Sequence, residues 1–103
     1  SEEEVLTWFN EVQIANIITP NNDGVNDVWS VPNLTALGGT VSVFDRAGNM
    51  VYESSKQTPN GDFWTGRLYN NGQQVMAATY FYVLTLEVGK EEQTRTGFIE
   101  LRR

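Results

Sequence analysis

Apolar and polar residues alternate over several short stretches of this chain, and this alternation predicts β-strands with one buried face. The alternation is cleanest over residues 40–45. The strongest strand is predicted over residues 78–88, where β-branched and aromatic residues follow one another. Gly48-Asn49 predicts a hairpin turn, because both residues tolerate a positive φ angle. Shorter strands are predicted over residues 12–18, 28–31, 50–54 and 93–101.

The last two strands are predicted to form a hairpin around residues 89–92. A two-residue loop would place Tyr80 opposite Ile99, and a four-residue loop would place Tyr82 there instead. Both registers keep Tyr80 and Tyr82 on the face that Ile99 shares, since a shift of two residues does not change the face. In the first register Gly97 lies opposite Tyr82 and leaves room for its large side chain.

About seven short strands with frequent turns are typical of an all-β, immunoglobulin-like β-sandwich of antiparallel strands, and a small barrel is the alternative. We find no convincing helix beyond one possible turn over residues 34–37. Residues 1–11 are predicted to be a linker or N-terminal extension, with residues 5–9 as a short strand or part of that linker. Residues 12–103 are predicted to be the sandwich domain.

Composition and charge remove several classes of function. The 103 residues carry a net charge of −6, which argues against nucleic acid and anionic membrane surfaces as partners. Cys and His are absent, which excludes disulfides, Cys/His zinc sites, thiol nucleophiles and a Ser-His-Asp triad. No apolar run is long enough for a transmembrane helix, and the acidic start is unlike a signal peptide.

The loop from residue 18 to residue 29 looks like a calcium loop. The EF-hand pattern fails, however, because Thr19 stands at the first ligand position and Ser30 at the twelfth. The residues favour a turn instead, in which Pro20 fixes one φ angle and Gly24 takes a positive one. A looser calcium site, and with it a calcium-stabilised structural spacer, remains an alternative that would use the oxygens of Asp23, Asn26 and Asp27.

Six aromatic residues raise the possibility of a sugar-stacking platform: Trp29, Trp64, Tyr69, Tyr80, Phe81 and Tyr82. A core position is the stronger interpretation for Trp29, Tyr80 and Tyr82, and it is weaker for Trp64, whose loop neighbours are polar. Close carboxylate pairs occur at Asp23/Asp27 and Glu91/Glu92. The Glu91/Glu92 pair is expected to be solvated in a hairpin turn, without the apolar wall that acid–base catalysis requires. We therefore predict no enzyme, no catalytic residue, no metal and no cofactor.

Basic residues are scattered, apart from Arg102-Arg103 with Arg95 near the end of the chain. They are interpreted equally well as charges that discourage edge-to-edge strand pairing and as part of a recognition surface.

Five stretches, in this order, resemble a known family: residues 19–27, 44–53, 63–66, 79–84 and 97–102. They are similar to the gliding-motility-associated C-terminal domain, the type B sorting domain of the type IX secretion system of the Bacteroidota. The resemblance covers roughly residues 12–103. The motif positions, structural or recognition in role, are Pro20, Asn21, Asp23, Gly24, Asn26, Asp27, Arg46, Gly48, Tyr52, Trp64, Gly66, Tyr80, Tyr82, Gly97 and Arg102.

The resemblance implies a non-enzymatic C-terminal sorting and cell-surface display domain of a larger exported, adhesin-like protein. Its partners would be the outer-membrane type IX secretion machinery and the upstream cargo domains of the same polypeptide. The parent would be secreted or held at the outer-membrane cell surface, and Arg103 would be its C-terminus. The alternative function is a carbohydrate- or adhesion-binding module of a secreted protein.

Overall fold

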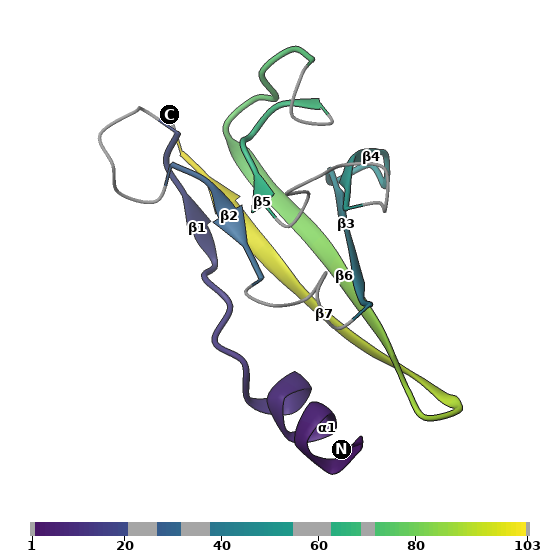
Figure 1. Cartoon of the computed structure of the whole chain (residues 1–103). Coiled ribbons are helices and arrows are strands. Elements are labelled where there is room, and N and C mark those ends of the chain that lie inside the picture. The colour runs from purple at the N-terminus through teal and green to yellow at the C-terminus, as the bar shows by residue number, and fades with distance from the viewer. Residues whose placement is uncertain (1, 21–26, 32–37, 55–62, 69–71, 103) are drawn as a thin grey trace.

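The computed structural model describes residues 2–20, 27–31, 38–54, 63–68 and 72–102 (Figure 1). One helix and seven strands follow in chain order: α1 (Glu2–Glu11), β1 (Ile17–Ile18), β2 (Trp29–Ser30), β3 (Thr40–Phe44), β4 (Met50–Glu53), β5 (Phe63–Trp64), β6 (Ala78–Val88) and β7 (Glu91–Leu101). A five-stranded sheet has the order β1-β7-β6-β3-β4, and β2 and β5 form a second sheet. The predicted all-β sandwich is confirmed.

The long hairpin β6–β7 is the centre of the larger sheet. Its eleven cross-strand pairs run without a break and place Tyr80 opposite Ile99, so the two-residue register is the observed one. Gly97 lies opposite Tyr82, as that register predicts. A Cβ atom at Gly97 would come within 2.5–2.6 Å of the Tyr82 ring and hydroxyl, so only glycine allows this ring to lie across the strand. The predicted shared face is also confirmed, since Tyr80, Tyr82 and Ile99 are all buried.

The predicted strands around residue 47 form the hairpin β3–β4. Side chains of β3 alternate as the sequence pattern requires, with Val41 and Val43 buried. The register shifts within the hairpin, because Val43 pairs with Tyr52 whereas Phe44 pairs with Met50. This irregularity leaves Val51 as an extra residue, and both Val51 and its neighbour Tyr52 are buried.

Four aromatic rings join the two sheets. Trp29 of β2 pairs with Trp64 of β5 across the smaller sheet. The Trp29 ring packs against Tyr82 with centroids 5.1 Å apart, and Trp64 packs edge-on against Tyr80 at 5.3 Å. The two indole N–H groups donate to the backbone carbonyls of residues 15 and 67, at 2.7 and 3.0 Å. The polar ends of these large rings are therefore satisfied inside the core.

The pairing of β1 and the short strands differs from the sequence-based expectation. β1 pairs in parallel with β7, so the strands are not all antiparallel. The strands predicted over residues 12–18 and 28–31 are reduced to two residues each, at Ile17–Ile18 and Trp29–Ser30. The possible helical turn over residues 34–37 lies outside the described residues.

α1 corrects the expectation of a short strand over residues 5–9 and of no convincing helix in this part of the chain. Phe9 is only 3% exposed and belongs to the core, and Val5 and Trp8 pack against it at the spacing of one helix face. The helix contacts β6 and lies towards the hairpin turn, whereas β2 and β5 lie towards the other end of the sheet (Figure 1). α1 therefore covers the part of β6 that the smaller sheet does not reach.

Arg95 of β7 fixes the C-terminal end of α1. Its Nη1 atom donates to the backbone oxygen of Phe9 at 3.2 Å and of Val12 at 3.0 Å. A cation at this end also opposes the negative end of the helix dipole, and Glu3 and Glu4 of the first turn oppose the positive end. Within the described residues no helix is both long enough and apolar enough to cross a membrane.

Replacing Phe9 by Ala is expected to lower the free energy of unfolding by about 3 kcal/mol, because the ring leaves a cavity in the core. Chemical denaturation followed by tryptophan fluorescence measures this change. Thr7→Ala is the matched control, since Thr7 lies on the exposed side of the same helix. Equal stability of Phe9→Ala and the wild type would contradict a structural role for α1.

Candidate functional site

Five motif positions in the described part of the chain are buried. Tyr52, Trp64, Tyr80 and Tyr82 are buried core residues, and Gly66 is buried in the turn after β5. Pro20 and Asp27 are half-buried at the two ends of the opening loop. The motif positions between them, Asn21, Asp23, Gly24 and Asn26, lie outside the described residues.

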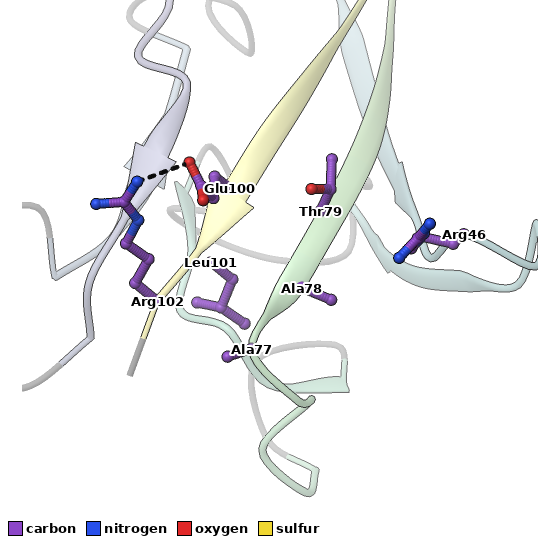
Figure 2. Close-up of a pocket in the computed structure, with 7 residues that line it drawn as sticks. All are labelled: Arg46, Ala77, Ala78, Thr79, Glu100, Leu101 and Arg102. Carbon is purple, nitrogen blue, oxygen red and sulfur yellow. Dashed lines mark hydrogen bonds and ion pairs between the residues drawn. The ribbon is translucent and has the colours of Figure 1, made fainter.

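Among the described motif positions, Arg46 and Arg102 are the two that present exposed charged side chains. They line one groove of about 540 Å³, at the end of the sheet where β6 begins and β7 ends. Figure 2 shows them on either side of Ala78 and Thr79, with Glu100 beside Arg102. A second hollow of about 250 Å³ adjoins it and shares Arg46, Ala78 and Thr79. Two guanidinium groups beside an open groove can bind a carboxylate or another anionic group of a partner.

The turn between β3 and β4 positions Arg46. Oδ1 of Asp45 accepts hydrogen bonds from the backbone N–H groups of Ala47 and Asn49, both at 2.9 Å. Oδ2 accepts a further bond from the Asn49 side chain at 3.2 Å. Gly48 has a φ angle of 88°, which allows its N–H to donate to the Asp45 carbonyl at 3.0 Å. The predicted hairpin turn is confirmed, and an aspartate that the sequence did not single out organises it.

Hydrogen bonds lower the pKa of Asp45 below its ordinary value of 3.8. The largest cause is the backbone N–H of Asn49, followed by the side-chain amide of the same residue. These donors favour the charged carboxylate in the folded state. The turn therefore gains stability above pH 3.8, and loses it as the pH falls through the lower pKa of the folded state.

The cluster of basic residues predicted near the end of the chain is not observed as predicted. Arg95 is part-buried and bonded to α1, away from Arg102. Arg102 instead pairs with Glu100 at 3.1 Å, and both side chains are exposed. Arg95 was expected near Arg102. Instead Arg46, more than fifty positions earlier in the chain, lines the same groove as Arg102.

The predicted sugar-stacking platform does not form from the aromatic residues proposed for it. Trp29, Trp64, Tyr80 and Tyr82 are all buried, and Tyr69 lies outside the described residues. Trp64, for which a core position was expected less strongly than for Trp29, Tyr80 and Tyr82, has no exposed surface. Of the six residues, Phe81 alone is described as exposed, at 47%.

The sheet face turned away from β2 and β5, here called the outer face, carries a line of apolar residues. Phe98 of β7 pairs with Phe81 of β6, Phe81 with Phe44 of β3, and Phe44 with Met50 of β4. We call these four residues the apolar row. Phe98 is 56% exposed, whereas Phe44 and Met50 are half-buried. Exposed apolar residues that lie side by side mark interaction surfaces more often than scattered ones do.

Sequence reasoning missed the apolar row, although part of the signal was present. Once Ile99 and Tyr80 are placed inside, strand alternation puts Phe98 and Phe81 on the polar face. The row becomes visible only when the register also brings Phe44 and Met50 to the same level of the sheet.

The described residues contain no group of three or more acidic side chains that could hold a metal ion. Glu91 and Glu92 are exposed at the start of β7. The looser calcium site proposed for the opening loop falls mostly outside the described residues and stays a prediction.

Part of the chain matches the model of a known protein family. Residues 12–101 match the family model described as CHU_C, type IX secretion signal domain. The matched region begins directly after α1 and includes every strand of both sheets. No curated protein matches the chain.

Replacing Asn49 by Ala is expected to raise the pKa of Asp45 towards 3.8, because the side-chain donor is lost while the backbone donor stays. An NMR titration of the carboxyl carbons measures the change. Asn10→Ala, on the exposed side of α1, is the control and should leave the pKa of Asp45 unchanged. An Asp45 that titrates at or above 3.8 in the wild type would show that the turn is not held in this way.

Proposed function

The chain belongs to the type IX secretion signal domain family, and we propose that it is the C-terminal sorting and cell-surface display domain of a larger exported protein. The observation that carries the proposal is the family match over residues 12–101. A secretion signal domain of this family marks an exported protein, whose destination we propose is the medium or the outer-membrane surface. The resemblance of its motifs implies an adhesin-like cargo upstream.

The proposed mechanism is recognition of a folded surface, without chemistry on a substrate. The core is closed by four aromatic rings, and the motif residues Tyr52, Trp64, Tyr80 and Tyr82 are buried in it. Among the described residues, the outer face, the strand edges and the groove of Arg46 and Arg102 are surfaces that a partner can reach. These features support a binding role, with the outer-membrane type IX machinery as the proposed partner.

α1 supports a defined connection to the cargo. It lies on the N-terminal side of the family match and is fixed to the core by Phe9 and Arg95. We propose that the upstream domain is joined to a packed helix and not directly to a flexible strand.

A reporter fusion tests the proposal. An enzyme that carries a signal peptide for inner-membrane export is joined to residues 1–103 and expressed in a bacterium with a working type IX system. The reporter is expected on the cell surface or in the medium. The same fusion in a strain without the type IX translocon, and the reporter alone in the competent strain, should both stay in the periplasm.

Two results would contradict the proposed function. One is retention of the fusion in the periplasm of the competent strain, although the domain is folded. The other is equal export with and without the translocon.

A further inference from the structure

Among the described residues, β7 has a long edge without a pairing strand. On one side it pairs with β6 over its whole length, and on the other it pairs with β1 only at Glu100 and Leu101. The backbone N–H groups of Glu100 and Arg102 donate outward to residues 16 and 18, at 2.8 and 3.0 Å. Because backbone groups of a strand alternate between its two sides, the even-numbered residues 92–98 point to the same outer side. No described residue bonds to their backbone groups.

Proline, lysine and bulges, which prevent strand addition, are missing from this edge, whose charged residues are Glu92 and Arg95, the latter bonded to α1. Proteins protect edges with proline, with lysine, with bulges or with a covering segment. Residues 92–98 contain neither proline nor lysine, and their pairing with β6 is regular throughout. Thr94, Thr96 and Phe98 are exposed. The edge is therefore suited to accept another strand.

Side chains beside the edge define what such a strand would carry. A strand added to β7 lies about 4.8 Å away, so its side chain next to Phe98 would extend the apolar row. At the other end of the edge, Glu92 lies directly opposite Glu87 on the outer face. Both are exposed and neither forms an ion pair with a described residue. Like charges in this position destabilise a sheet, and a basic side chain from a partner would neutralise them.

We propose that the edge of β7 over residues 92–98 binds an extended segment of the type IX machinery as an additional β-strand. The segment carries an apolar residue beside Phe98 and a basic residue beside Glu92, six positions or about 20 Å apart. Backbone hydrogen bonds supply much of the affinity, and these two side-chain contacts set the register. This inference rests on the proposed function and names the surface through which it acts.

A second copy of the chain is a poorer occupant of the edge. If two β7 strands paired antiparallel across residues 92–98, each Glu92 would lie beside a partner Phe98. The acidic pair of Glu87 and Glu92 would then stay without a neutralising charge. The proposed partner segment would place an apolar residue beside Phe98 and a basic residue beside Glu92.

Thr96→Pro tests the backbone contact. The substitution removes an outward N–H group and places a ring at the edge, while the bonds to β6 use the odd-numbered residues and stay intact. In the reporter fusion, export by Thr96→Pro is expected to fall about tenfold, the factor for roughly 1.4 kcal/mol of lost binding free energy. Thr96→Ala keeps the N–H group and should be exported like the wild type. Thermal unfolding of both purified variants checks that they are folded.

Glu92→Lys separates recognition from stability. The change relieves the repulsion from Glu87, so the thermal unfolding temperature should stay equal or rise. It also repels the basic residue proposed for the partner, so export should fall. A loss of export without a loss of stability cannot be explained by a structural role of Glu92.

Hydrogen exchange of the free domain tests the edge without any partner. NMR should show fast exchange for the amides of Thr94, Thr96 and Phe98, and slow exchange for Gln93, Arg95 and Gly97. Equal protection of both sets would mean that the edge is already covered and would overturn the proposal.

The other results are also decisive. Folded Thr96→Pro that is exported like the wild type overturns strand addition but leaves the sorting function standing. A wild-type fusion that is not exported overturns the sorting function and this partner with it. If sedimentation shows a dimer that Thr96→Pro dissociates, the edge pairs with a second copy, and the proposal is wrong.

Discussion

The packing of two tryptophans against two tyrosines is the interaction on which the rest of the structure depends. A two-stranded sheet with two residues in each strand has no independent stability, so β2 and β5 exist only because Trp29 and Trp64 pack on β6. Tyr80 and Tyr82 are two positions apart and therefore project from the same face. Gly97 completes the arrangement, because any larger residue would collide with the Tyr82 ring.

This packing also determines where recognition can take place. It places the large rings on the inside of the sandwich, so among the described residues the outer face and the strand edges are the surfaces proposed for a partner. Arg46 reaches the groove beside Arg102 because a carboxylate-organised turn ends β3. The same β6–β7 register that aligns the core rings brings Phe81 and Phe98 together outside. Core and candidate surface are thus two sides of one hairpin.

Much of the fold could be predicted because the strongest signal was local. Eleven residues of strand pattern in β6 predicted its bounds, its buried face and, to within two residues, its register. α1 was missed because its apolar spacing at Val5, Trp8 and Phe9 is short, and a ten-residue helix is marginal without partners. Arg95, which stabilises the helix end, lies near the opposite end of the chain, so no local pattern indicates the contact. The meeting of Arg46 with Arg102 depends on tertiary packing and leaves no local pattern.

We propose that the secretion machinery reads the folded surface of the sandwich, and not a linear segment, as the sorting signal. Export of reporter fusions can be measured against the folded fraction of the domain, in a series of core variants at Trp29, Trp64 and Leu84. None of these side chains is exposed by more than 1%, so each substitution changes folding without removing an accessible contact. If the folded surface is the signal, export falls in proportion to the folded fraction. A variant that is unfolded at the temperature of the assay and is still exported like the wild type would contradict it.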